Sequence, residues 1–325
     1  MKAVQFSRFG APDEVADVVD LPDPPAPGPG QALAEFLCAP INPADLLNLQ
    51  GLYGVVPPLP SIGGLEGVGR VVAVGPGVAN VRPGDRVLIG GGAWRERQVV
   101  PAAGLFPLPE GLPSEQLAML TVNPLTARAL LQEVDLAPGE FVIKNAANSG
   151  VGRSFFAFAR RAGLRGIAVV RRPGLEDMLK SWGAEHVLVD GPDLAERVRA
   201  IVGDGRLRLG VDAVGGAATG RIAASLSPGG VVINYGVLSG EACHASPVDL
   251  IFRGVSLRGY WLLHWFQRTP QDQIAAAFAD VIAMLGAGEL TTPIDATYPL
   301  SRVRDALRHA AREGRGGKVL LVAEP

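Results

Sequence analysis

Apolar and polar positions alternate in two different ways along the chain, and the change falls near residue 115. Before it, short apolar runs at 32–37, 69–74 and 85–89 are separated by Pro and Gly. Runs of this length between turn residues predict strands. The first part of the chain is therefore expected to be a compact β-rich barrel or sandwich.

After residue 115 the pattern becomes one of alternating helices and strands. Two helices are expected first, at 114–120 and 126–134. Apolar strand runs then begin at residues 141, 166, 186, 209 and 230, and segments of helical periodicity separate them, at 151–162, 175–182, 194–202 and 219–226. This alternation predicts a parallel sheet with helices on both faces.

The last part of the chain contains two more expected helices, 271–285 and 302–313, and a final strand, 318–322. We expect this segment to return to the first domain, which makes the α/β region an insertion. The expected boundaries are residues 1–115 with 266–325 for the first domain and residues 116–265 for the second.

Composition narrows the class of protein. The chain has 325 residues, of which 48% are hydrophobic and 19% charged, so it has enough apolar material for two cores. Its net charge of −2 argues against nucleic acid or an anionic membrane as a partner. The start resembles a strand and no apolar run approaches the length of a membrane span, so we expect a soluble, cytoplasmic protein.

The segment Asn145-Ala-Ala-Asn-Ser-Gly-Val-Gly152 follows the strand at 141 and opens a helix. Gly150 and Gly152 allow the backbone to approach a pyrophosphate, and the helix N-terminus offers free N–H groups. The segment departs from G-x-G-x-x-G because Asn145 and Ala147 replace early glycines. A glycine turn in an unrelated α/β sheet is the alternative interpretation.

The next strand ends in Arg171-Arg172-Pro173. A fold that prefers NAD usually has an acidic residue there, which binds the ribose 2′-hydroxyl. Guanidinium groups instead bind phosphate, and NADP carries a 2′-phosphate at this place. The pair therefore favours NADPH, with two solvated surface arginines as the alternative.

Metal ligands are not expected. The chain has two cysteines, Cys38 and Cys243, so a four-cysteine zinc site is excluded. Leu65 stands where zinc alcohol dehydrogenases of similar organisation have a histidine ligand, and Asn42 to Asp45 supply no thiolate. We interpret Glu66 as structural and not as a catalytic base.

Several segments together resemble the zinc-independent medium-chain dehydrogenases/reductases, and most of all the mitochondrial-type trans-2-enoyl thioester reductases. The resemblance covers essentially the whole chain. Its more specific parts are Asn145–Gly152, Gly51-Leu-Tyr53 and Gly259-Tyr-Trp261, whereas Asn42-Pro-Ala-Asp45 and Gly64-Leu-Glu-Gly67 are shared with quinone oxidoreductases.

This resemblance implies a GroES-like β-rich catalytic domain, a doubly wound Rossmann domain and a homodimer. It implies Tyr53 as the catalytic residue. For NADPH, the residues expected to bind are Asn42, Asn145, Asn148, Ser149, Gly150, Val151, Gly152, Arg171, Arg172, Tyr235, Gly236, Val237, Leu238, Tyr260, Trp261, Leu262 and Lys318. For the substrate pocket they are Tyr53, Asn123, Trp261 and Trp265.

Two departures from the family affect the fine contacts with the cofactor. The family commonly has Arg-Asp-Arg-Pro where this chain has the shorter Arg171-Arg172-Pro173, and Val237 replaces a common second glycine. Asn42 is expected to orient Tyr53 or the cofactor amide, with a simple Asn-Pro turn as the alternative. Trp261 and Trp265 would equally fit an apolar core.

The expected reaction adds a hydride to Cβ of an enoyl thioester and a proton to Cα. Charge develops on the thioester oxygen, so donors aimed at it lower the barrier. A tyrosine hydroxyl is protonated at neutral pH and can give the proton. The alternatives are reduction of a quinone or of other α,β-unsaturated carbonyls, and a non-enzymatic role as an NADPH-binding crystallin or an RNA-binding protein.

Overall fold

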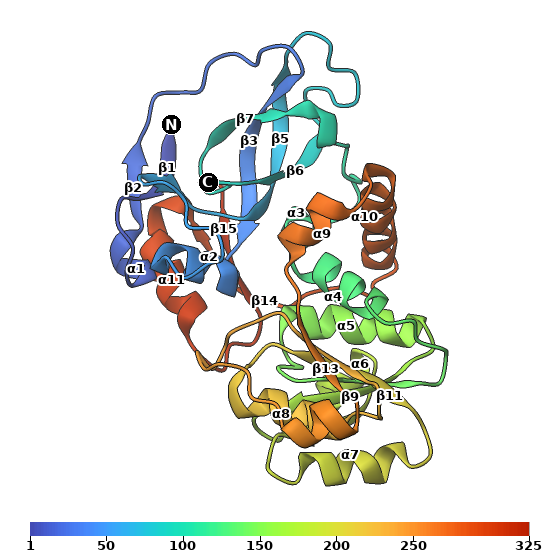
Figure 1. Cartoon of the computed structure of the whole chain (residues 1–325). Coiled ribbons are helices and arrows are strands. Elements are labelled where there is room, and N and C mark those ends of the chain that lie inside the picture. Colours follow the sequence, from blue (N-terminus) through green and yellow to red (C-terminus); the bar gives the residue numbers. More distant parts are fainter. Residues whose placement is uncertain (325) are drawn as a thin grey trace. The chain divides into compact units, whose positions relative to one another are not determined.

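The computed structural model describes residues 1–324, which form two compact units. The first unit contains residues 1–121 and the described residues from 291 onward, and the second contains residues 122–290. The second unit is therefore an insertion in the first, drawn from green to orange in Figure 1. The α/β class expected from the sequence is confirmed.

The first unit is built on two sheets. The larger has the order β14-β15-β3-β5-β6, with β7 paired to β3, and the smaller has the order β2-β1-β4. Their bounds are β1 Lys2–Phe6, β2 Asp17–Asp20, β3 Gln31–Pro40, β4 Ser61–Ile62, β5 Glu66–Val74, β6 Arg86–Gly90, β7 Arg97–Pro101, β14 Ile294–Pro299 and β15 Lys318–Val322. Because β15 pairs antiparallel with β3, the end of the chain completes the sheet begun near its start.

The helices of the first unit are short. They are α1 Pro12–Val15, α2 Pro43–Gln50, α3 Ser114–Leu117 and α11 Val303–Ala311, with 3-10 turns η1 Ala102–Gly104 and η3 Leu300–Arg302. The core between the sheets and α11 is apolar, and Phe6, Ile41, Leu49 and Trp94 are fully buried in it. The helix expected at 114–120 is present as the shorter α3, which begins after Pro113 without a side-chain cap.

The second unit has one six-stranded sheet, and all its strands are parallel. The order is β10-β9-β8-β11-β12-β13, which is the order of a Rossmann fold. The strands are β8 Phe141–Lys144, β9 Arg165–Val170, β10 Ala184–Val189, β11 Leu207–Asp212, β12 Val231–Asn234 and β13 Ser256–Gly259. The edge strand β13 was not expected from the sequence, because Leu257 is its only large apolar residue.

The second unit also contains seven α-helices among the described residues. They are α4 Asn123–Gln132, α5 Gly150–Arg161, α6 Glu176–Ser181, α7 Leu194–Val202, α8 Gly216–Ser225, α9 Leu262–Arg268 and α10 Gln271–Gly286, with a single π-helical turn, η2, at Val248–Phe252. Apolar strand residues such as Phe141, Ile143, Ile167 and Leu207 form the core beneath them. The order in which strands are added to the sheet reverses between β8 and β11, and in such folds ligands bind beyond the carboxyl ends of the strands at that point.

The division into units differs from the expected boundaries. Residues 266–290, expected in the first domain, cluster with the second unit. Helix α10 packs on α4, and its Asp280 carboxylate forms ion pairs with Arg128 and Arg161 at 3.0 and 3.2 Å. These contacts depend on packing between segments far apart in the sequence, so the local pattern does not indicate them.

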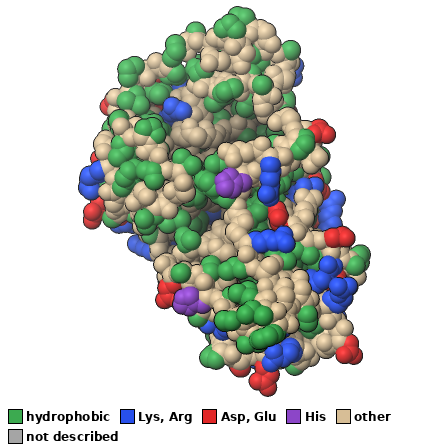
Figure 2. Space-filling model, viewed as in Figure 1, with side chains coloured by type: hydrophobic (Ala, Val, Ile, Leu, Met, Phe, Trp, Pro, Cys, Tyr) green, Lys and Arg blue, Asp and Glu red, His purple; other side chains and the backbone are tan. Residues whose placement is uncertain are grey.

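Acidic and basic side chains are interspersed on the face of the molecule shown in Figure 2. Among residues 1–324, no helix has both the length and the apolar character needed to cross a bilayer.

Candidate active site

The turn between β8 and α5 has the geometry of a phosphate-binding loop. Ser149 caps α5, and its hydroxyl accepts a hydrogen bond from the Gly152 amide at 3.1 Å. Ala146 has a positive φ of 43°, which is rare for a residue other than glycine. A Cβ at Gly152 would lie 2.0 Å from the Ala147 carbonyl oxygen, so only glycine fits there. The turn therefore presents backbone N–H groups at a helix N-terminus.

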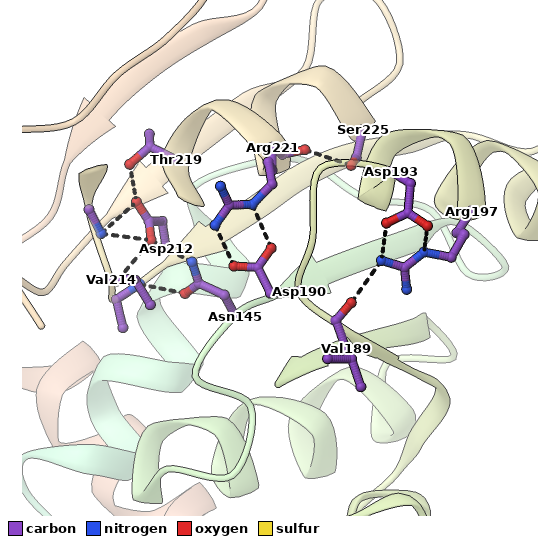
Figure 3. A network of polar contacts seen from close by, with 12 residues as sticks. Asn145, Val189, Asp190, Asp193, Arg197, Asp212, Val214, Thr219, Arg221 and Ser225 are labelled. Atoms are coloured by element: carbon purple, nitrogen blue, oxygen red, sulfur yellow. Dashed lines mark hydrogen bonds and ion pairs between the residues drawn. The ribbon is translucent and has the colours of Figure 1, made fainter. Parts of the chain in front are cut away.

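A buried carboxylate, Asp212 at the end of β11, organises the floor of this turn (Figure 3). It accepts hydrogen bonds from the Asn145 side-chain amide at 2.6 Å and from the Thr219 hydroxyl at 2.6 Å. Further donors are the Asn234 side chain and the amides of Val214 and Gly215. Burial alone would raise the pKa of Asp212, but these donors hold it below its usual value. Asp212 thus connects the ends of β8, β11 and β12.

Asn145 is held at both ends of its side chain. Its amide donates to Asp212, and its carbonyl oxygen accepts from the Ala213 amide at 2.8 Å. The orientation of Asn145 in the turn is therefore fixed by the neighbouring strand.

A buried lysine, Lys144, is the last residue of β8. Its Nζ donates to the Tyr235 hydroxyl at 2.7 Å and to the Asn145 carbonyl at 2.9 Å. The Tyr235 hydroxyl also shares a hydrogen bond with the Ser149 side chain. Burial lowers the pKa of Lys144 to about 7, and the nearby Asp212 carboxylate opposes this shift. Asn145, Ser149 and Tyr235, all expected to bind the cofactor, therefore belong to one polar network.

The arginine pair follows β9 directly. Arg171 and Arg172 are both exposed, at the same carboxyl edge of the sheet as the turn. At that edge, the segment after β12 packs closely on the segment after β11, since a Cβ at Gly236 would lie 2.7 Å from the Ala213 carbonyl oxygen. Val237 and Leu238, which follow, are exposed. These residues line the side of the sheet on which a dinucleotide is expected to bind.

The remaining residues expected to bind the cofactor or substrate near this turn differ in how exposed they are. Asn148 is exposed, whereas Val151 is buried and offers its backbone alone. Asn123 is buried at the start of α4, and a Cβ at Gly150 would lie 3.1 Å from its side chain. Asn123 thus packs against the first residue of α5.

The aromatic candidates lie where β13 leads into α9. Tyr260 is buried, and its hydroxyl has no hydrogen-bond partner among the described residues. Trp261 and Leu262 are half-buried, and the Trp261 ring stacks edge-on against His264 at 5.0 Å. Trp265 is buried against Phe266.

In the first unit, helix α2 leads to Tyr53. The helix begins after Asn42, whose amide donates to the Asp45 carboxylate at 2.8 Å. It ends at Gly51 in the left-handed conformation, with φ of 72°. A Cβ at Gly51 would also lie 2.8 Å from the Phe9 ring. This cap turns the chain, so that Tyr53 lies half-buried in a segment with exposed apolar neighbours.

A buried polar cluster anchors the other end of α2. The Asn42 side-chain amide donates to Glu66 at 2.8 Å, and the Lys318 ammonium donates to the Asn42 carbonyl oxygen. Glu66 also accepts a hydrogen bond from the Thr121 amide at 3.0 Å. Burial lowers the pKa of Lys318 to about 8, although Glu66 and Asp45 act to raise it. Asn42 and Lys318 are thus brought together in this cluster.

The cluster also contains Asp45, whose carboxylate accepts from the Leu65 amide at 2.9 Å. Burial raises the pKa of Asp45 to about 7, against the opposing effect of its amide donors. Within residues 1–324, no group of three His, Cys, Asp or Glu side chains has the arrangement to hold a metal ion.

Two central residues of the second unit were not singled out from the sequence. Asp212 ends an apolar strand at the carboxyl edge of the sheet, a position that could have marked it. Lys144 gave no such signal, because a lysine that ends a strand is usually exposed.

Two family models match the chain. One, described as the alcohol dehydrogenase GroES-like domain, matches residues 28–110, and the other, described as zinc-binding dehydrogenase, matches residues 150–280. The second description refers to zinc, although the positions that would carry ligands hold Asn42 and Leu65 here.

Curated relatives match over nearly the whole chain. The mitochondrial enoyl-[acyl-carrier-protein] reductase of Homo sapiens is 35% identical over 99% of this chain and 88% of its own length. That of Arabidopsis thaliana is 35% identical over 81% of this chain and 72% of its own length. Among solved structures, an NADPH:quinone reductase assigned in Bacillus thuringiensis is 29% identical, covers 99% of both chains and has a TM-score of 0.92. A mycobacterial protein solved with NADPH is 28% identical, covers 99% of this chain and all of its own, and has a TM-score of 0.88.

These relatives correct one expectation. The cytoplasmic location expected from composition is contradicted, because the matching curated reductases are named as mitochondrial in animals and in a plant. Location is set by address signals that receptors recognise, and the composition of a folded domain does not record them.

Proposed function

The chain belongs to the enoyl-[acyl-carrier-protein] reductase family within the medium-chain dehydrogenases/reductases, and from this premise we propose that it is an NADPH-dependent reductase of trans-2-enoyl thioesters. The observation that carries the proposal is Tyr53, the proposed proton donor, which follows the cap of α2 in a chain that is 35% identical to such reductases over 99% of its length.

The residues of the second unit fit a dinucleotide. The Gly152 backbone leaves no room for a Cβ, and the capped start of α5 offers N–H groups to a pyrophosphate. Arg171 and Arg172, both exposed after β9, suit the 2′-phosphate that distinguishes NADPH from NADH. The mycobacterial relative solved with NADPH supports the same cofactor. When bound, NADPH supplies the hydride that adds to Cβ of the substrate.

The chain's own residues supply the proton and the binding. As charge builds on the thioester oxygen, hydrogen-bond donors at that oxygen stabilise the enolate. The Tyr53 hydroxyl then gives its proton to Cα, and solvent returns a proton to the phenolate. In the first unit, Asn42 and Lys318 hold each other in place, and we propose that both contact the cofactor.

Parallel assays with three acceptors test this function. NADPH consumption is followed with crotonyl-CoA, with a longer enoyl-CoA and with a quinone. We expect turnover of the enoyl thioesters, and far slower turnover with NADH. Turnover of the quinone alone would show that the thioester assignment is wrong.

The second candidate function is quinone reduction. It is favoured by the structural similarity to the Bacillus thuringiensis protein, at a TM-score of 0.92 and 29% identity. Quinone reduction by hydride needs no obligatory tyrosine. A Tyr53→Phe variant that retains full quinone turnover and loses thioester turnover would show both activities and separate their requirements.

We also propose that two copies of the chain pair through β13. This strand is at the edge of the sheet, and edge strands present unpaired backbone groups. The preceding turn exposes Ile251 and Phe252, at 70% and 79% of their surface, which favours an apolar interface. Phe252→Glu should yield monomers by sedimentation analysis, whereas Val72→Glu, a control on β5, should not.

A further inference from the structure

Lys144 is a buried cation at the base of the phosphate-binding turn. Its side chain is fully buried, and it lies between β9 and β11, paired with Ala168 on one side and Val211 on the other. A charged group in such a place is costly unless hydrogen bonds and opposite charge compensate for it. Its position therefore requires an explanation beyond the reaction proposed above.

The contacts of Lys144 all lead to parts of the cofactor site. Its ammonium donates to the Asn145 carbonyl, which begins the turn, and to the Tyr235 hydroxyl beyond β12. Tyr235 in turn shares a hydrogen bond with Ser149, the residue that caps α5. Lys144 thus supports the first residue of the turn directly and its last residue through Tyr235.

We propose that Lys144 is a cofactor-positioning residue, whose ammonium supports the turn and Tyr235 for an anionic dinucleotide, so that NADPH binding takes up a proton. The proposal rests on NADPH being the cofactor. An ammonium beneath the turn attracts the phosphate groups that bind above it, and by reciprocity those groups favour the ammonium over the neutral amine.

Few titratable or charged side chains face Lys144 from the neighbouring strands. From β11 the Asp212 carboxylate acts on it, and beyond β12 its titratable neighbour among residues 1–324 is Tyr235, whose pKa burial raises. From β9 it faces Ala168, which does not titrate. Asp212 stays ionised at neutral pH because its donors lower its pKa. Lys144 is therefore the group in this network that changes charge near pH 7 to 8.

The size of the effect follows from the pKa of Lys144, about 7 in the free protein. If bound phosphates raise it by about one unit, the protonated fraction at pH 8 rises from about one tenth to about one half. NADPH binding at pH 8 should then take up about 0.4 proton, and the Kd should rise about fivefold between pH 7 and pH 9.

Calorimetric titration of NADPH into the full chain at pH 8, in buffers of different ionisation enthalpy, measures this uptake. At that pH the cofactor 2′-phosphate, with a pKa of about 6, is already ionised. We expect Lys144→Met to lose about 0.4 proton per bound NADPH relative to the wild type. Lys180→Met is the control, because Lys180 is an exposed lysine on α6 outside the proposed cofactor site, and this variant should keep the proton uptake of the wild type.

Lys144→Gln provides a second variant that keeps a donor for Tyr235 but not the charge. Between pH 7 and pH 9, its Kd should rise about fivefold less than the Kd of the wild type. Equal proton uptake in the wild type and in Lys144→Met, or a Kd of the wild type that does not change with pH, would overturn the proposal. A chain that binds no NADPH at all would instead show that the proposed cofactor is wrong.

Discussion

Replacing Asp212 by asparagine is the most direct test of how the cofactor site is organised. The change keeps the shape of the side chain and removes its charge. In the protein, the carboxylate accepts hydrogen bonds from five donors, which belong to Asn145, Val214, Gly215, Thr219 and Asn234. An asparagine has one acceptor oxygen, and its NH₂ group would face donors.

The magnitude follows from these contacts. The Thr219 hydroxyl can rotate and accept, but the backbone N–H groups cannot, and an Asn234 amide that flips to accept would lose its hydrogen bond to the Gly236 carbonyl. A hydrogen bond to a charged group contributes about 1.5–3 kcal/mol, and a buried donor without a partner costs about 1–3 kcal/mol. We therefore expect Asp212→Asn to lower the free energy of unfolding by about 3 kcal/mol. For a domain of this size, this loss lowers the Tm by roughly 6–12 °C.

Asp190→Asn is the matched control at the same edge of the sheet. Asp190 accepts two hydrogen bonds from Arg221, at 2.7 and 2.6 Å, but both side chains are partly exposed (Figure 3). A pair of this kind contributes about 0–1 kcal/mol. Thermal and urea unfolding, followed by circular dichroism, compare the two variants. If Asp212→Asn loses no more stability than Asp190→Asn, the inference that Asp212 organises the floor of the turn is refuted.

Three further predictions concern the proposed site. Tyr53→Phe should lower the turnover of crotonyl-CoA by roughly tenfold or more, with the Kd of NADPH unchanged by fluorescence titration, since only the proton donor is lost. Arg171→Ala and Arg172→Ala should each raise the Kd of NADPH by roughly tenfold and leave that of NADH unchanged, because only NADPH has the 2′-phosphate; equal losses for both cofactors would contradict the assignment. Gly152→Ala should abolish measurable NADPH binding, because its Cβ would lie 2.0 Å from a carbonyl oxygen; retained affinity would show that the turn does not hold the pyrophosphate.

Much of the second unit was predictable from local pattern. Its apolar strand runs are long enough to be recognised, and β8, β9, β10, β11 and β12 lie where the runs predicted them. Periodicity works there because parallel strands are buried on both faces. The edge strand β13 has a polar and exposed sequence, so hydrophobic pattern alone does not reveal it.

The first unit was less predictable. Helix α2 was missed because Asn42-Pro43 predicts a turn as readily as a helix start, although Asn42, Asp45 and Gly51 cap its two ends locally. Glu66 and Lys318, which anchor Asn42, come from β5 and β15. Contacts between residues so far apart in the sequence depend on how the sheet forms, and the local sequence pattern gives no signal for them.

The two buried lysines show most clearly where sequence reasoning ends. Lys144 ends β8 and Lys318 begins β15, so in sequence each borders an apolar strand like an ordinary solvated residue. In the structure both are buried, and burial lowers both pKa values, to about 7 and about 8. In both, the energetic cost of burying a charge is offset by specific neighbours, Asp212 for Lys144 and Glu66 with Asp45 for Lys318. Apolar residues of similar volume would stabilise the fold at least as well as these buried lysines. Both lysines lie close to residues expected to bind an anionic cofactor. Ligand binding therefore explains their presence more readily than stability does.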